Sequence, residues 1–395
     1  MNIAFFVDGY YPTINGVITV IAQLKKEMEK EGHKVLIFTV ESRDKAHRDE
    51  VEPGIYRSPG TSTVLPTLKG QYIAVPNLSK IKKIMKENDI QICHAHTEFS
   101  MGRACYRCAR GLHIPCVATT HTMWEDYYKY YFYGSEIVPA KVVRKLVKKF
   151  TNHFNAIINV SRKAYDYYHL PDMVPNVPAR IIPNAIDESK FHNADYSEEE
   201  KKELRKSLGL KDGDKMILYT GRVVEEKRVE ELFTVLADIV SKRDNVKAVF
   251  VGSGLKDESL RKRITKEGLE DKIIMTGFVT WPDIAKYYAI ADIFVTASLS
   301  EMHSMTVLEA ITMSNPIVCR KDSSFTDTIF QGENGYLADT DEEMKDYILK
   351  LLDDDELRLK MSKKAFDISQ RFSLSNQVKR HIEYYEEVIR DYQNS

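Results

Sequence analysis

Residues 216–228 read MILYTGRVVEEKR, and their pattern indicates the fold class. The run at 216–220 is typical of a buried strand, and Gly221 ends it. A helical pattern follows at 228–243 and a second strand pattern at 247–251. Alternation of this kind predicts a parallel sheet with helices on both of its faces.

The same alternation runs through the whole chain and restarts once. In the first half, strands are expected at 2–7, 34–40, 90–94, 115–120, 156–160 and 180–182. In the second half they are expected at 216–220, 247–251, 273–276, 293–297 and 316–320, with nearly continuous helix from 342. Turn residues at 183–187 and a separate charged helix at 196–206 divide the halves. We predict two doubly wound α/β domains, 1–190 and 191–374, with a helix at about 375–395 that packs back on the first.

Length and composition support this organisation. The 395 residues suit two domains, and 43% hydrophobic with 29% charged residues excludes wholesale disorder. Every apolar run is far shorter than the roughly 18–20 residues of a membrane span. The start MNIAFFVD has no basic leader, which predicts a cytoplasmic protein. The 5 cysteines do not suggest a disulfide framework.

Charge is unevenly divided between the halves. Residues 1–190 carry 26 Lys and Arg against 19 Asp and Glu, a balance of +7. The remaining residues hold 31 and 39, a balance of −8. A basic half suits an anionic surface or substrate. The bias is too small to indicate a nucleic-acid partner.

Several candidate site residues follow predicted strands, where ligands of doubly wound sheets bind. Arg222 and Lys227 are placed to hold a diphosphate, because Arg offers a fork of donors and Lys a point charge. The alternative is a solvated helix start whose cations pair with Glu225 or Glu226. Gly252, in the sequence GSG, lets a ligand approach the backbone, although a plain turn is the alternative.

The stretch 300–310, SEMHSMTVLEA, carries the strongest functional signal. Ser304 is a candidate N-cap, which would leave the N–H groups of Met305, Thr306 and Val307 available to a phosphate. Glu309, one turn further in, can accept two hydrogen bonds from a ribose diol. In the first half, His121 ends a predicted strand and is expected to titrate near neutral pH, with a buried core histidine as the alternative.

The order of these segments resembles the retaining glycosyltransferases of family 4. The resembling segments are 12–17 (PTINGV), 221–227, 252–254, 277–279 (GFV) and 301–309. The resemblance implies the GT-B fold, in which two Rossmann-like domains face a central cleft. The first domain would bind the acceptor and the second the nucleotide sugar. The family often has Gly at the position of Ser304, so the identity of the donor sugar stays open.

The resemblance also implies a role for each donor-site residue. Arg222 and Lys227 would hold the diphosphate, and Glu309 the ribose. The backbone near Phe278 and Val279 would hold the base. The two residues assigned to catalysis are Glu301, which would contact the sugar hydroxyls, and His121, which would lie beside the sugar. Gly16 would let a loop of the first domain approach the diphosphate.

Residues 94–102 and 121–127 are similar to segments of bacterial diacylglycerol 3-glucosyltransferases. This similarity implies acceptor contacts from His96, Trp124 and Tyr127. An aromatic run at 127–133 suits a lipid–water boundary. The window 137–165 contains no acidic residue, and Val142, Leu146, Phe150 and Phe154 recur every fourth position. A basic amphipathic helix that lies on an anionic membrane is predicted from Lys141, Arg144, Lys145, Lys148 and Lys149. The alternative is a surface helix that packs its apolar stripe inward.

Metal chemistry has little support in the sequence. The single Cys-x-x-Cys, at 105–108, lies in a helical pattern, which argues against zinc. The acidic run at 353–355 lies far from any predicted strand end. We therefore expect a peripheral cytoplasmic enzyme without cofactor or metal that moves glucose from UDP-glucose to diacylglycerol. The alternatives are a soluble glycan or small-molecule acceptor, a nucleotide-sugar sensor, and an epimerase or phosphorylase.

Overall fold

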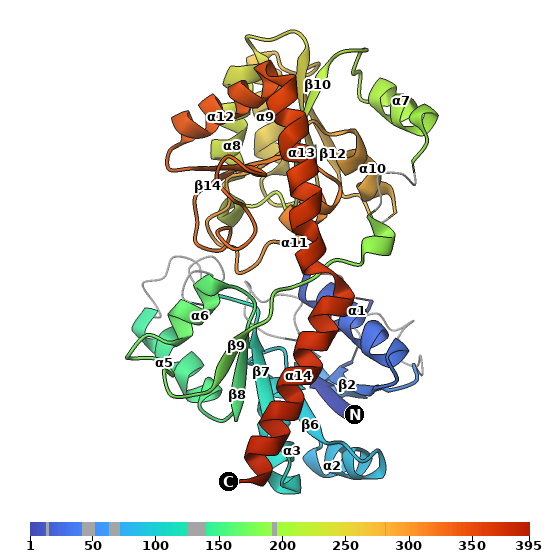
Figure 1. The fold of residues 1–395 in the computed structure, drawn as a ribbon, viewed down its shortest axis with the longest axis vertical. Helices are drawn as coiled ribbons and strands as arrows, with labels where there is room; N and C mark the ends of the chain where they lie inside the picture. The colour runs from blue at the N-terminus through green and yellow to red at the C-terminus, as the bar shows by residue number, and fades with distance from the viewer. Residues whose placement is uncertain (13–15, 42–51, 63–71, 125–139, 192–195, 281) are drawn as a thin grey trace. The chain divides into compact units, whose positions relative to one another are not determined.

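The computed structural model describes residues 1–12, 16–41, 52–62, 72–124, 140–191, 196–280 and 282–395 (Figure 1). It divides into two compact units. Unit 1 consists of Met1–Asn184 and Leu374–Ser395, and unit 2 of Ala185–Ser373. The division falls six residues before the predicted boundary at 190. The chain returns to unit 1 at Leu374, so the C-terminal helix belongs to the first unit.

Unit 1 contains a seven-stranded parallel sheet of order β3-β2-β1-β6-β7-β8-β9. Its strands are β1 (Asn2–Phe6), β2 (Lys34–Val40), β3 (Ile55–Ser58), β6 (Ile92–Ala95), β7 (Cys116–Thr120), β8 (Ala156–Asn159) and β9 (Ala179–Ile181). A small antiparallel pair joins β4 (Gly60–Ser62) to β5 (Tyr72–Ala74). The helices are α1 (Gly16–Lys30), α2 (Leu78–Glu87), α3 (Ser100–Leu112), α5 (Ala140–Thr151), α6 (Arg162–Tyr168) and α14 (Leu374–Gln393).

Both faces of this sheet are buried, which explains why its strands are apolar throughout. On β1, Ile3 and Phe5 join a core that includes residues of α1 and α14. Ala4 and Phe6 point to the opposite face and join a core that includes α2 and α3. The return of α14 alongside α1 can be followed in Figure 1.

Unit 2 contains a six-stranded parallel sheet of order β12-β11-β10-β13-β14-β15. Its strands are β10 (Lys215–Thr220), β11 (Val246–Val251), β12 (Ile273–Gly277), β13 (Ile293–Thr296), β14 (Ile317–Arg320) and β15 (Gly335–Ala338). The helices are α7 (Glu198–Ser207), α8 (Val229–Val240), α9 (Asp257–Glu267), α10 (Asp283–Ile290), α11 (Met305–Thr312), α12 (Asp341–Asp353) and α13 (Asp355–Ser369). Two parallel sheets with helices on both faces confirm the predicted fold class.

Some elements were not predicted. β3, β15 and the β4–β5 pair are short, and β3 and β15 are the edge strands of their sheets. Within the described residues, no helix combines the length and apolar content that a membrane crossing needs.

Candidate active site

Four neighbouring strands of unit 2 end at the segments singled out from the sequence. Arg222 and Lys227 follow β10, Gly252 follows β11, Val279 follows β12 and Glu301 follows β13. The strand order reverses between β10 and β13. In doubly wound sheets, ligands bind in the crevice at such a reversal. The structure therefore brings these five residues to one edge of one sheet.

Both basic residues at this edge are paired with carboxylates. Arg222 donates to Glu226, and Lys227 Nζ lies 2.5 Å from Glu301 Oε1. The predicted alternative for Arg222, a pair with Glu226, is therefore present. The Arg222 side chain is nevertheless 53% exposed, whereas that of Glu226 is only 9% exposed. Its guanidinium can reach an anion that enters from solvent.

Glu301 is a charged acceptor in a mostly buried position. Its side chain is 16% exposed. Burial opposes ionisation, but the Lys227 ammonium and hydrogen bonds outweigh burial and hold the pKa of Glu301 below its ordinary value. A fixed carboxylate of this kind can accept hydrogen bonds from sugar hydroxyls.

Helix α11 begins at this edge, and Ser304 is its N-cap as predicted. Ser304 Oγ accepts from the Val307 N–H at 3.4 Å. The expectation that Val307 offers a free N–H is therefore wrong, because its own N-cap uses that donor. The N–H groups of Met305 and Thr306 have no hydrogen-bond partner in the described residues. Two donors at the positive end of α11 remain for a phosphate.

Glu309 lies one turn into α11 and is held by a buried tyrosine. Tyr288 Oη donates to Glu309 Oε2 at 2.6 Å. Burial raises the pKa of Glu309 to about 7, although the hydrogen bond from Tyr288 opposes the rise. The sequence did not single out Tyr288, because it lies inside an apolar helix with no pattern that marks it.

The glycine at Gly252 is required by its surroundings. A Cβ there would lie 1.9 Å from the Gly221 carbonyl oxygen, and φ is +140°. The loops that follow β10 and β11 are therefore in direct contact. At the next strand end, Val279 is half-buried while Phe278 is 66% exposed. This leaves an open apolar surface beside the segment expected to hold the base.

In unit 1, the predicted residues follow β1, β6 and β7, which are neighbours in the sheet. Gly16 opens α1 and is exposed. His96 follows β6 and His121 follows β7, and His96 Nδ1 lies 3.2 Å from His121 Nε2. The structure thus brings His96 and His121 together at the carboxyl edge of this sheet.

The expectation that His121 titrates near neutral pH is wrong. Burial, and then the charge of His381, lower the pKa of His121 to about 3. His94, His96 and His381 pack in the same region, and burial lowers the pKa of each. His121 is therefore neutral at physiological pH. It can exchange hydrogen bonds with a substrate but supplies no positive charge.

Trp124 is half-buried and packs edge-on against Phe99, with ring centroids 5.2 Å apart. Tyr127 and the aromatic run at 127–133 lie outside the described residues. The structure adds Glu98 to this region. Burial raises its pKa to about 7, against an opposing interaction with the Trp124 indole. A lone glutamate after a short strand gave no signal in the sequence.

Helix α5 is basic, but its surroundings differ from the prediction in two ways. Arg144 pairs with Asp172 at 2.7 Å, and Lys148 donates to the Asp172 backbone oxygen. The acidic partner, Asp172, lies outside the acid-free window 137–165. The prediction of a single apolar stripe with a residue at every fourth position is also wrong. Phe150 and Phe154 are buried, whereas Val142 and Leu146 are 44% and 56% exposed.

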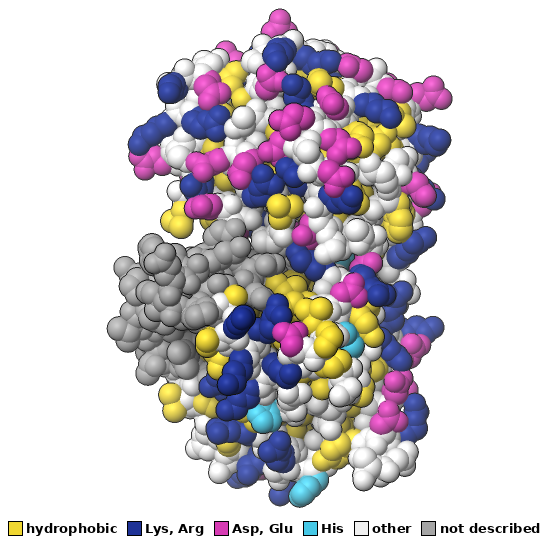
Figure 2. Space-filling view, turned by 90° about the vertical axis from the view of Figure 1, so that its left-hand side faces the viewer, with side chains coloured by type: hydrophobic (Ala, Val, Ile, Leu, Met, Phe, Trp, Pro, Cys, Tyr) yellow, Lys and Arg dark blue, Asp and Glu magenta, His cyan; other side chains and the backbone are white. Residues whose placement is uncertain are grey.

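The exposed face of α5 instead interleaves charge and apolar surface. It consists of Lys141, Val142, Lys145, Leu146 and Lys149. Figure 2 shows the side of unit 1 that carries α5 and α6, where Lys and Arg side chains are frequent and Asp and Glu are few. Such a face suits an anionic surface.

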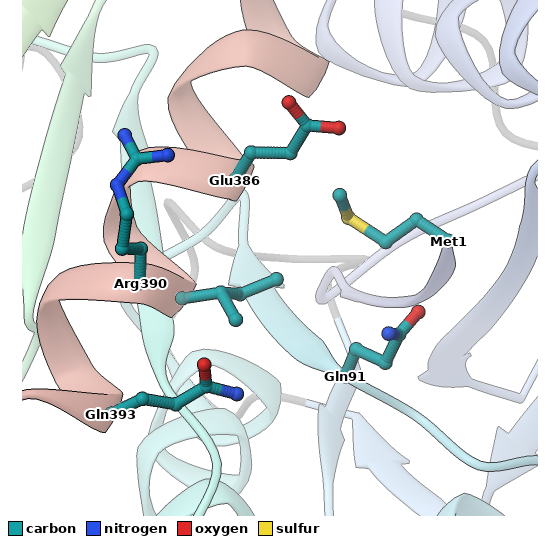
Figure 3. Close-up of a pocket in the computed structure, with 6 residues that line it drawn as sticks. Met1, Gln91, Glu386, Arg390 and Gln393 are labelled. Atoms are coloured by element: carbon teal, nitrogen blue, oxygen red, sulfur yellow. The ribbon is translucent and has the colours of Figure 1, made fainter.

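Among the described residues, the acidic clusters and the hollow considered next do not form a site of this kind. Across the described ranges, no group of three or more His, Cys, Asp or Glu side chains is placed to hold a metal ion. Asp353 pairs with Arg243, and Asp355 with Lys215 and Arg358. An open hollow of about 520 Å³ lies between α14 and the segments at Met1 and Gln91 (Figure 3). These segments precede β1 and β6, so the hollow is at the amino edge of the sheet, away from the ligand-binding edge.

Two family models match the chain. Residues 14–190 match "Glycosyltransferase Family 4" and residues 200–367 match "Glycosyl transferases group 1". The chain is 33% identical over 391 residues to an alpha-monoglucosyldiacylglycerol synthase of Streptococcus pneumoniae, covering 98% of this chain and 86% of the relative. It is 29% identical to an alpha-monoglucosyldiacylglycerol synthase of Acholeplasma laidlawii, covering 92% of each.

Solved structures share the fold at lower identity. The HepE protein of Anabaena, solved in complex with UDP, superposes with a TM-score of 0.78 at 19% identity and covers 98% of this chain and 100% of its own. A sucrose-phosphate synthase of Thermosynechococcus elongatus gives a TM-score of 0.79 at 17% identity, covering 99% of each.

Proposed function

Because the chain belongs to glycosyltransferase family 4, we propose that it is a retaining hexosyltransferase that moves glucose from UDP-glucose to diacylglycerol with an α linkage. The observation that carries the proposal is the near full-length relationship to two synthases of α-monoglucosyldiacylglycerol. The arrangement at the ends of β10–β13 supplies matching chemistry, since it gathers cations, helix N–H groups and two glutamates.

The proposed donor site uses these groups in order along the nucleotide sugar. The backbone near Val279 holds the base, in a loop that exposes Phe278, and Glu309 accepts from the ribose diol. Arg222, Lys227 and the N–H groups of Met305 and Thr306 hold the diphosphate, which the close-packed Gly252 loop borders.

The proposed reaction is a front-face substitution. The acceptor hydroxyl oxygen bonds to the anomeric carbon as the bond from that carbon to the diphosphate breaks. The hydroxyl proton passes to the departing phosphate oxygen, so the products are the α-glucoside and UDP. Glu301 and neutral His121 orient the sugar hydroxyls, and the cations and N–H dipoles neutralise the leaving charge without a metal. His96, Trp124 and Tyr127 are proposed to contact the acceptor.

The exposed face of α5 supports a peripheral location on the inner surface of the cell membrane. Three lysines and two apolar side chains alternate there, and each lysine near an anionic bilayer contributes about 1 kcal/mol. A soluble glycan or small-molecule acceptor is the second candidate. The contacts of Asp172 with Arg144 and Lys148 favour it, because they use part of the basic surface within the protein.

A donor and acceptor screen read by mass spectrometry tests the proposal. UDP-glucose with diacylglycerol in mixed vesicles should give glucosyldiacylglycerol, with UDP released only when acceptor is present. Transfer to soluble glycans alone would favour the second candidate. UDP release without acceptor, or nucleotide binding without any transfer, would contradict a transferase and favour an epimerase or a sensor.

A further inference from the structure

Two buried hydroxyl groups and the half-buried carboxyl group of Glu309 form a hydrogen-bond chain beneath the proposed ribose site. Tyr288, on α10, has no exposed surface. Its Oη lies 2.6 Å from Glu309 Oε2 on α11 and 2.5 Å from Thr220 Oγ1 at the end of β10. Thr220 is 2% exposed. Three elements that Figure 1 labels, β10, α10 and α11, therefore meet through one phenol oxygen.

The direction of this chain depends on the protonation of Glu309. The phenol has one proton to donate. When Glu309 is ionised, Tyr288 donates to the carboxylate and Thr220 donates to Tyr288. When Glu309 is protonated on Oε2, its O–H donates to Tyr288 and Tyr288 donates to Thr220, whereas a proton on Oε1 leaves the direction unchanged. The charged carboxylate accepts hydrogen bonds from ribose hydroxyls more strongly than the protonated carboxyl group does.

Few groups contribute to the charge of Glu309. Burial raises its pKa, and the Tyr288 hydroxyl is the opposing influence. Tyr288 in turn faces Thr220 and Tyr219, which belong to β10. Among the described residues of α10, α11, α13, β10 and β14, no cationic side chain pairs with Glu309. The carboxylate therefore depends on a neutral donor, whereas Glu301 has Lys227.

We propose that Tyr288 and Thr220 are positioning residues that favour the ionised state of Glu309 and aim it at the ribose, so that nucleoside recognition has a pH dependence separate from the ionisation of the diphosphate itself. This inference rests on the proposed function, in which Glu309 accepts from the ribose diol. The site is then built from two independent parts. One part is cationic and holds the diphosphate. The other is the Glu309 carboxylate, whose pKa is lowered by the hydrogen bond from the buried phenol of Tyr288.

The test is calorimetry of the full chain with UDP and with inorganic pyrophosphate between pH 6 and pH 9. In the wild type, the ratio of UDP affinity to pyrophosphate affinity should rise with pH as Glu309 ionises. Tyr288→Phe should weaken UDP about tenfold at pH 7, since a hydrogen bond to a charged group is lost. The defect should shrink towards pH 9, and the midpoint of the pH profile should move upward. Pyrophosphate affinity should not change.

Two further variants separate positioning from a structural defect. Thr220→Val should move the midpoint in the same direction by a smaller amount, and it serves if Tyr288→Phe does not fold. Tyr287→Phe removes a phenol hydroxyl from the preceding residue of α10 and should leave the pH profile of UDP binding unchanged. A loss of UDP affinity that is equal at every pH, or an unmoved midpoint in both variants, would overturn the inference.

Glu309→Gln distinguishes this inference from the function on which it rests. If that variant binds UDP as the wild type does, the ribose role of Glu309 is wrong and the proposed function loses its nucleoside contact. If it loses UDP affinity while Tyr288→Phe and Thr220→Val keep the wild-type midpoint, only the positioning role is wrong.

Discussion

Lys227 Nζ lies 2.5 Å from Glu301 Oε1, so the lysine proposed to hold the diphosphate is already paired with the glutamate proposed to meet the sugar. Their side chains are 14% and 16% exposed. The pair connects the loop after β10 to the loop after β13, the two strands between which the strand order reverses. Diphosphate and sugar would therefore enter a site whose opposite charges already hold each other in place.

This pair predicts different consequences for the two basic residues. Arg222→Ala and Lys227→Ala should each weaken UDP binding about tenfold or more, because each removes a charge-assisted contact. Lys227→Ala should also lower the free energy of unfolding by roughly 3 kcal/mol, since it leaves Glu301 buried without its cation. Arg222→Ala should lower the free energy of unfolding by less than Lys227→Ala does, because the Arg222 side chain is 53% exposed, although its partner Glu226 is only 9% exposed.

Calorimetry with UDP and chemical denaturation of both variants provide the measurements. The double variant Lys227→Met with Glu301→Gln is the control, and it should recover part of the stability. Unchanged UDP affinity in both single variants would contradict the diphosphate assignment.

Gly252→Ala should destabilise unit 2 and weaken nucleotide binding. The added Cβ would meet the Gly221 carbonyl oxygen, and the backbone conformation is strained for any other residue. Gly213→Ala is the matched control, because it also has a positive φ but its Cβ would enter open space. We expect Gly252→Ala to cost at least about 2 kcal/mol more than the control. Equal losses of unfolding free energy would show that the two loops can separate.

The fold could be predicted because buried parallel strands are apolar in sequence and alternate with amphipathic helices. The positions of Arg222, Gly252 and Glu301 at strand ends followed from that alternation. The edge strand β15 could not be predicted, because Gly335–Ala338 is too short to show a period. The bond between Tyr288 and Glu309 joins two helices, and no local pattern encodes such a contact. The same limit explains the error on α5, where Asp172 comes from a distant turn.

Activity is expected to be independent of metal ions. Arg222, Lys227 and the start of α11 can neutralise the leaving diphosphate, which is the role a bound cation would otherwise take. Transfer rates should be the same with excess EDTA and after removal of the chelator. Loss of activity in EDTA that Mg²⁺ or Mn²⁺ restores would contradict this prediction.

Unit 1 should lose stability as the pH falls below about 6.5, the ordinary pKa of histidine. Burial lowers the pKa of His121 to about 3 and of His381 to about 4, so the unfolded chain takes up protons first. The contribution of these histidines to the free energy of unfolding is therefore fully present above pH 6.5. It falls as the pH drops from 6.5 to the folded pKa values, by at most about 1.4 kcal/mol per pH unit for each histidine. Denaturation curves at pH 7, 6 and 5 measure the decline. His381→Gln should flatten it, whereas His113→Gln, at an exposed position, should not.

The exposed face of α5 should bind anionic vesicles. Lys141, Lys145 and Lys149 alternate there with Val142 and Leu146. Each lysine contributes about 1 kcal/mol near an anionic bilayer, an attraction screened within about 8 Å at physiological salt. Vesicles with anionic lipid should sediment with the protein at low salt. Zwitterionic vesicles should bind it much less, and moderate salt should release it.

Changing Lys141, Lys145 and Lys149 together to Glu should abolish this binding and leave UDP affinity intact, because none of these lysines belongs to the proposed donor site. Changing Lys80, Lys83 and Lys86 to Glu makes the same total change of charge on the exposed surface of α2. If net charge alone drives binding, both triple variants will lose it equally. If α5 is the contact, the α2 variant will keep most of it. A wild-type protein that ignores anionic vesicles at low salt would leave α5 as an ordinary surface helix, and a soluble acceptor would become the better proposal.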